Sequence, residues 1–281
     1  MALVTLGEIL NTAKEGNYAV PAFDTLDHVS AGAVIAAAEA ANRPVILMVP
    51  EVALPMIDVE SFFEDLVKIA KNAKVPVALE LDHGKSYDVL VKAIRSGFTG
   101  VMFDGSELPF EENVAMTKKI VEVAHAAGVS VEAEIGHVAG GEGNMEEGSE
   151  VDESMYTKPE DAKRFAEETG VDALAIAFGT VHGVYKGTPK LDLERLTTIK
   201  NMVSVPLVMH GGSGVSDEEF QKAVKAGINK VNFFTEISMA AVANAVAYGQ
   251  KKECKLHFIE LLLVAKKTVA ERVAHYIELL K

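Results

Sequence analysis

Residues 77–84 read Val-Ala-Leu-Glu-Leu-Asp-His-Gly, an apolar run that ends in an ionisable pair followed by glycine. This pattern predicts a buried strand whose carboxyl end carries Asp82 and His83. Chemistry in parallel α/β sheets is usually placed at this end of the strands. Residues 173–183 and 206–211 repeat the design, because each is an apolar run that leads into His-Gly. The three stretches together indicate parallel strands with functional carboxyl ends.

The alternation of strand-like and helix-like segments continues along the chain from residue 19. The expected strands cover 19–23, 45–49, 77–82, 100–104, 129–134, 173–179, 206–209 and 229–233. The expected helices between them cover 28–42, 60–73, 86–96, 110–127, 159–169, 192–201 and 216–226. Eight strand-helix units with short connections favour an α/β fold, a closed (β/α)8 TIM barrel, with an open doubly wound sheet as the alternative.

The two ends of the sequence are expected to add helices to this barrel. Residues 5–15 have helical spacing, and Thr5 and Glu8 are spaced as a capping box. The last ~40 residues carry an apolar stripe that predicts extra C-terminal helices, packed against the barrel or a partner subunit. We expect one domain over residues 1–281, since an α/β barrel commonly fills about 250 residues.

Composition restricts the partners and the location. The formal net charge of −14 disfavours nucleic acid and anionic membranes as partners. Cys254 is the only cysteine, which excludes an internal disulfide framework and a cysteine-based zinc site. The sequence shows neither a basic-then-apolar leader nor an apolar run of ~18 residues. We therefore expect a cytoplasmic protein whose metal ligands, where it has any, are histidines and carboxylates.

Three histidines stand at matching strand ends. In a barrel all carboxyl ends of the strands meet at one rim, which would bring His83, His182 and His210 around a single cavity. Three imidazoles with an open position form a catalytic zinc environment, although another divalent cation would also suit them. One such histidine alone is more often a hydrogen-bonding residue. The remaining histidines are expected at the surface: His28, His125, His137, His257 and His275.

Several carboxylates are expected near this metal. Asp82 could donate a proton or orient the substrate, and its alternative role is to cap a turn. Glu132 and Glu134 are two residues apart on a strand, so their side chains face the same side. If that side is the interior, Glu134 is the better candidate for a fourth ligand. Asp104 and Glu132 could form a second metal site, or Asp104 could belong to a structural polar layer.

The segment His210-Gly-Gly-Ser-Gly has the features of a phosphate-binding loop. Its glycines let the backbone approach an anion closely, Ser213 adds a hydroxyl, and Ser216 begins a helix whose N-terminus favours negative charge. Barrel phosphate sites commonly use the loops after strands seven and eight. This loop is the seventh, and residues 232–235 form the eighth. The polar loop 142–155 is the one candidate for a mobile lid.

These motifs resemble the class II, metal-dependent ketose-bisphosphate aldolases over nearly the whole chain, and most closely the shorter tagatose-bisphosphate aldolase branch. The matching stretches are 18–23, 81–84, 108–113, 132–136, 178–186, 208–214, 230–232 and 235–236. The resemblance implies zinc at His83, His182 and His210, with Glu134 as an exchanging ligand. It is also consistent with a monovalent cation in the site and with a homodimer or homotetramer.

The resemblance also implies the substrate and the proton-handling groups. A ketose phosphate would bind the metal through its carbonyl and adjacent hydroxyl and be cleaved reversibly to dihydroxyacetone phosphate and an aldehyde. Asp82 would handle the proton on the aldehyde-side hydroxyl, and Glu142 would exchange a proton with the ketone carbon. Glu142 is alternatively one acid among many on a solvated loop. The residues expected to hold the dihydroxyacetone phosphate half are Gly183, Lys186, Gly211, Gly212, Ser213, Asn232 and Thr235.

The chain departs from the family pattern around the other half of the substrate. Where the family usually has Asn after Ala-Phe, this chain has Asp24, and where it often has Gln-x-Ser after the second strand, this chain has Met48-Val49-Pro50. Pro50 has neither a hydroxyl nor an N–H for a distal phosphate. An added negative charge at Asp24 would repel a phosphorylated aldehyde. We therefore expect an altered aldehyde half, shorter or unphosphorylated.

Two other readings are compatible with these residues. A metal-dependent barrel hydrolase or isomerase also uses rim histidines and carboxylates, but it would need no phosphate-binding loop. A catalytically silent sugar-phosphate binding protein is suggested by the altered positions. Aldol cleavage by the metal-loaded protein would separate the aldolase from both alternatives.

Overall fold

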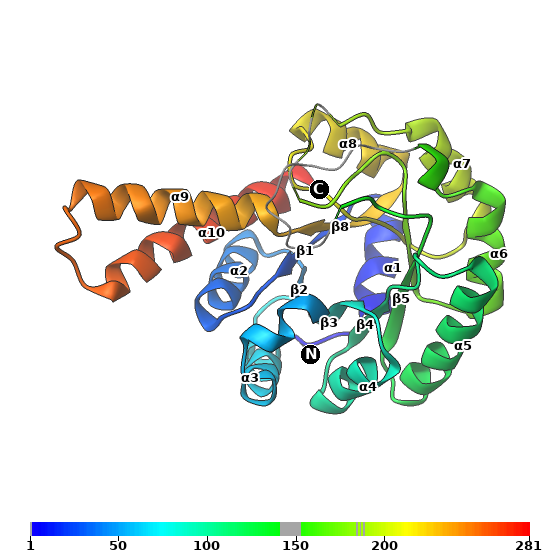
Figure 1. The fold of residues 1–281 in the computed structure, drawn as a ribbon, viewed down its shortest axis with the longest axis horizontal. Helices are drawn as coiled ribbons and strands as arrows, with labels where there is room; N and C mark the ends of the chain where they lie inside the picture. Colours follow the sequence, from blue (N-terminus) through cyan, green and yellow to red (C-terminus); the bar gives the residue numbers. More distant parts are fainter. Residues whose placement is uncertain (1, 141–152, 184, 186, 188) are drawn as a thin grey trace.

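The computed structural model describes residues 2–140, 153–183, 185, 187 and 189–281, and its centre is a barrel of parallel strands (Figure 1). The strands follow one another in chain order around the barrel, and β8 pairs with β1 to close it. The closed (β/α)8 barrel predicted from the sequence is therefore confirmed, and the open sheet is excluded. The strands are β1 (Val20–Asp24), β2 (Val45–Pro50), β3 (Val77–Gly84), β4 (Gly100–Phe103), β5 (Ser130–Ile135), β6 (Ala173–Ile176), β7 (Leu207–Met209) and β8 (Ile228–Phe233).

Helices surround the barrel and connect consecutive strands (Figure 1). They are α2 (His28–Ala41), α3 (Val59–Asn72), α4 (Tyr87–Ser96), α5 (Phe110–Ala126), α6 (Pro159–Thr169), α7 (Leu193–Met202) and α8 (Asp217–Ala226), with short 3-10 helices η1 (Glu51–Met56) and η2 (Glu153–Met155). The strand and helix ends lie within two residues of those expected, except that β6 ends at residue 176 rather than 179. The chain leaves the sheet early there, ahead of His182.

The first helix closes one end of the barrel. The predicted capping box of α1 (Leu6–Gly16) is present, because the Glu8 N–H donates to Thr5 Oγ1 and the Thr5 N–H donates to Glu8 Oε2. The Leu6 and Leu10 side chains of α1 are fully buried against inward-facing strand residues such as Ala78. The Val4 N–H donates to the Val77 carbonyl at the start of β3, so this is the amino end of the barrel. The carboxyl end of the barrel is therefore the open end, where the candidate active site lies.

The barrel has an apolar outer face and a partly polar interior. Outward-facing residues such as Leu79 and Val101 pack against the surrounding helices in one large core. The interior combines small apolar residues such as Ala78 with Glu80 and Lys230, which are both fully buried. Strand alternation explains this division, because residues two apart share a face.

The predicted extra C-terminal helices form a hairpin. Figure 1 shows α9 (Thr235–Lys251) and α10 (Phe258–Leu279) extending together beyond the barrel, and α10 then returns along α2. The stripe predicted on this segment divides in two. Val273 and Ile277 are buried against the barrel, whereas Ile259 and Leu263 are more than half exposed. Among the described residues, no helix is long and apolar enough to cross a membrane.

Candidate active site

The end of β3 presents two adjacent side chains to the same site. Neighbouring residues of a regular strand point to opposite faces, so Asp82 and His83 could not both face inward. The pairing with β4 shifts register between Leu81 and Gly84, and His83 adopts a left-handed backbone with φ of 46°. A positive φ is costly for a residue other than glycine and is typical of functional sites. This irregularity places Asp82 on the cavity and His83 among the other rim histidines.

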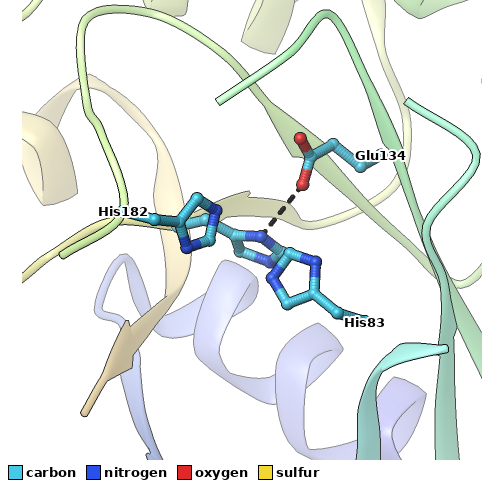
Figure 2. A group of neighbouring side chains, drawn as sticks. His83, Glu134 and His182 are labelled. Carbon is cyan, nitrogen blue, oxygen red and sulfur yellow. Dashed lines mark ion pairs between the residues drawn. The ribbon is translucent and has the colours of Figure 1, made fainter. Parts of the chain in front are cut away.

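The structure brings His83, His182 and His210 together from β3, from the loop after β6 and from the end of β7. Their ring centroids lie 4.6 to 5.9 Å apart. With Glu134 of β5 they form a group in which one ligand atom from each residue lies within 4.8 Å of the others. Figure 2 shows Glu134 pointing from β5 toward the histidine rings.

This group has the chemistry of a divalent cation site. His210 Nδ1 and Glu134 Oε2 are 3.0 Å apart and buried, and neither makes a hydrogen bond of normal geometry within the described part of the chain. Burial, together with His83 and His210, lowers the pKa of His182 well below its ordinary value, so its ring stays neutral and able to bind a metal. Three imidazoles and one carboxylate are a donor set typical of zinc, so these residues fit the metal expected from the sequence.

Two further carboxylates hold the rings of this group. Asp104 Oδ2 lies 2.9 Å from His83 Nδ1 and 2.8 Å from Lys85 Nζ. Burial alone would raise the pKa of Asp104, but His83 and Lys85 outweigh it and hold the pKa well below its usual range. Glu132 Oε1 lies 2.9 Å from His210 Nε2. Such partners fix the orientation of metal-binding imidazoles. Asp104 and Glu132 thus contact two different rings, and the second metal site suggested for them stays a prediction.

A buried ion cluster lies beneath the histidines, and sequence patterns do not indicate it. Lys230 Nζ is 2.6 Å from Glu80 Oε2 and 2.7 Å from Glu132 Oε2, and all three side chains are fully buried. Burial opposes the charge of Lys230, but the two glutamates keep its pKa above the ordinary value. Burial and the charge of Glu132 raise the pKa of Glu80 well above its usual range, which favours a protonated Glu80. One feature of the sequence could have indicated part of this cluster. Strand alternation places Glu80 on the same inward face as Asp82.

Replacing Lys230 by methionine is expected to lower the free energy of unfolding by about 3–5 kcal/mol, because it leaves Glu132 charged and buried without its cation. Replacing Glu80 by glutamine keeps the volume and removes no charge from a protonated acid, so we expect a change of under about 1 kcal/mol. Denaturant unfolding of both variants measures the difference. Equal losses in the two variants would contradict this charge assignment.

A cavity of about 300 Å³ opens at the carboxyl end of the barrel, beside the metal group. Six of the residues predicted to bind substrate line it on the side of loops six to eight: Gly183, Gly211, Gly212, Ser213, Asn232 and Thr235. Asp82 also lines it, and Asn232 Nδ2 donates to Asp82 Oδ1 at 3.3 Å. Glu142 and Lys186 lie outside the described residues, so their predicted roles stay predictions.

The loop after β7 is held close to its neighbours, which requires glycine. Gly211 has φ of 67°, and a Cβ there would lie 2.3 Å from the Val181 carbonyl oxygen. The Tyr185 hydroxyl donates to the Gly211 carbonyl at 2.6 Å and accepts from the Val181 N–H at 3.1 Å, a brace that sequence patterns did not indicate. Ser213 Oγ accepts from the Glu236 N–H at the start of α9. Backbone groups at a helix N-terminus beside a glycine loop suit an anion.

The fold and this site define a class of protein: a (β/α)8 barrel with a histidine-rich, metal-capable group beside a glycine-lined cavity. Three comparisons with known proteins identify the family within this class. The family described as "Fructose-bisphosphate aldolase class-II" matches residues 4–281. Fructose-bisphosphate aldolase of Geobacillus stearothermophilus is 43% identical over 247 residues, 85% of this chain and 83% of that protein. The crystal structure of the YdjI aldolase of Escherichia coli K12 superposes with a TM-score of 0.86 at 33% identity, covering 99% and 97% of the two chains.

The chain belongs to the class II fructose-bisphosphate aldolase family. Fructose-bisphosphate aldolase of Staphylococcus aureus strain Mu50 is likewise 43% identical, over 86% of this chain and 84% of that protein. The protein is therefore an aldolase, a lyase that cleaves a carbon-carbon bond, and the family is typically metal-dependent. This confirms the family resemblance and the enzyme class predicted from the motifs. The narrower likeness to the tagatose branch stays a prediction.

Proposed function

We propose that this aldolase uses zinc to cleave a ketose phosphate reversibly to dihydroxyacetone phosphate and an aldehyde. The observation that carries the proposal is the convergence of His83, His182, His210 and Glu134 beside a glycine-lined cavity. These four side chains would hold the cation. When bound, it supplies Lewis-acid stabilisation of the negative charge that develops on the substrate carbonyl oxygen.

The chain's own groups would then position the substrate and hold its protons. The loop around Gly211 and Ser213, next to the N-terminus of α9, binds the phosphate of the dihydroxyacetone half through backbone N–H groups. Lys186 follows His182 in the sequence and is proposed to add a positive charge to that phosphate. Asp82 is held by Asn232 in the cavity, where its carboxylate would take the proton of the hydroxyl on the carbon that becomes the aldehyde as its carbon-carbon bond to the dihydroxyacetone half breaks. Glu142 is proposed to exchange the proton at the ketone carbon.

The quaternary structure and location belong to the same proposal. We propose a homodimer or homotetramer, because the α9–α10 hairpin exposes large apolar side chains that a second copy would cover. These are Met239, Val242, Val246, Phe258, Ile259 and Leu263. The charge of −14 supports a small phosphorylated sugar rather than nucleic acid or membrane as partner. The single cysteine supports the cytoplasm, a reducing compartment.

Metal removal and reconstitution test the proposal. Protein treated with a chelator is assayed before and after addition of zinc, with fructose and tagatose 1,6-bisphosphates and their 1-phosphates as substrates. The expected result is cleavage that requires the metal, with dihydroxyacetone phosphate identified as a product by NMR. Full activity of the metal-free protein would contradict the metal role. Release of inorganic phosphate without aldol cleavage would instead indicate a hydrolase.

A further inference from the structure

The side of the cavity next to the phosphate loops is built from the ends of β1 and β2 and from η1. Its lining residues are Asp24, Leu26, Pro50, Val52, Ala53 and Met56. The dihydroxyacetone phosphate half is assigned to loops six to eight, so this side receives the aldehyde half of the substrate. The chemistry of this wall therefore decides which aldehydes the enzyme handles.

Among the described residues, this wall has no cationic side chain for a phosphate. Proteins bind phosphate with Arg or Lys, or with free backbone N–H groups. Among the described residues that line the cavity there is no lysine or arginine. Pro50 has no N–H, and the neighbouring side chains are apolar. Lys85, which follows β3, lies 2.8 Å from Asp104 and is not part of the lining. A second phosphate would therefore lose its hydration without a cationic side chain to compensate it.

Asp24 adds an acidic group to this wall. Its Oδ1 is buried and has no hydrogen-bond partner in the described part of the chain. Burial and the charge of Asp82 raise the pKa of Asp24 well above its usual range, which favours a protonated Asp24. The neighbouring charge of Asp82 disfavours a further negative charge in this region. A phosphate dianion placed here would increase that cost. A sugar hydroxyl would instead satisfy Asp24, because a carboxyl group can accept from it or donate to it.

We infer that the aldehyde half of the substrate is uncharged and hydroxylated, so that the enzyme prefers ketose 1-phosphates to ketose 1,6-bisphosphates, with Asp24 as the residue that sets this preference. The inference rests on the proposed function, because it takes the first phosphate to bind at loops six to eight. It goes further in naming the substrate class and the residue that selects it.

Four substrates and two variants test the inference. The zinc-loaded enzyme is assayed with fructose and tagatose 1-phosphates and with the corresponding 1,6-bisphosphates. We expect kcat/KM for the 1-phosphates to be higher by on the order of tenfold or more. Asp24→Ala removes the group that would hydrogen-bond the terminal hydroxyl of the 1-phosphates, and it is expected to shift this ratio toward the bisphosphates by on the order of tenfold. Asp88→Ala, at an exposed position of α4, is the matched control and leaves the ratio unchanged.

The outcomes separate this inference from the proposed function. A wild-type preference for the bisphosphates would overturn the inference while leaving the aldolase intact. An unchanged ratio in a folded Asp24→Ala variant would overturn the role of Asp24. If none of the four sugars is cleaved, the proposed function fails. Titration calorimetry with fructose 1-phosphate and fructose 1,6-bisphosphate then decides the inference, which requires the tighter binding of the 1-phosphate.

Discussion

Replacing His210 by alanine is expected to lower kcat/KM for aldol cleavage by at least about 10³-fold and to remove most of the bound metal. His210 is fully buried between two carboxylates, with Nδ1 at 3.0 Å from Glu134 and Nε2 at 2.9 Å from Glu132. Its loss deletes one proposed ligand and leaves Glu134 without the ring that positions it. Glu132 keeps its ion pair with Lys230, so the barrel is expected to fold.

Steady-state kinetics and elemental analysis of the purified variant measure this effect. His28→Gln is the control, because His28 is exposed and pairs with Asp65 on the surface helices rather than at the rim. The control should keep the wild-type metal content and rate. Full metal content with normal activity in His210→Ala would show that the convergence of the three rings is not a metal centre.

Replacing Asp82 by asparagine is expected to reduce kcat by about 10²–10⁴-fold, the range for loss of a positioned proton-transfer group. The amide keeps the shape of the side chain beside Asn232 but cannot take a proton from the substrate hydroxyl. Asp82 does not belong to the His83, Glu134, His182 and His210 group, so metal content should stay unchanged.

Separate values of kcat and KM, together with metal content, distinguish this role from a structural one. Loss of a proton-transfer group lowers kcat, whereas loss of a turn cap would lower the stability and leave kcat near normal. Asp88→Asn serves as the matched control. A folded Asp82→Asn variant with a normal kcat would favour the turn-capping role considered from the sequence.

Much of the fold could be predicted from the sequence because a barrel repeats one local pattern. Most strands are short apolar runs, and several helices begin with a side-chain cap, such as the Thr5 and Glu8 capping box of α1 or Ser216 before α8. The convergence of His83, His182 and His210 followed from topology, since parallel strands place their carboxyl ends at one rim. Neither inference needed knowledge of side-chain packing.

Other features depend on contacts that periodicity does not encode. Regular strand alternation would have turned His83 away from Asp82, and only the register shift and the left-handed backbone explain how both reach the site. The Lys230 cluster joins Lys230 to acids 98 and 150 positions away in the chain, and strand periodicity does not indicate that these three side chains meet. The C-terminal stripe was predicted as one surface, but it divides where α10 leaves the barrel.

The two walls of the cavity come from different parts of the rim. The histidines and the loops proposed to bind phosphate belong to β3 and to β6–β8, whereas the wall proposed to receive the aldehyde comes from β1, β2 and η1. A directed-evolution library confined to positions 24, 26, 50, 52, 53 and 56 would therefore change which aldehyde is accepted. The residues proposed to bind the metal and dihydroxyacetone phosphate would stay unchanged. Under these proposals the chain is a scaffold for carbon-carbon bond synthesis in which new aldehydes can be screened without changing the metal-binding residues.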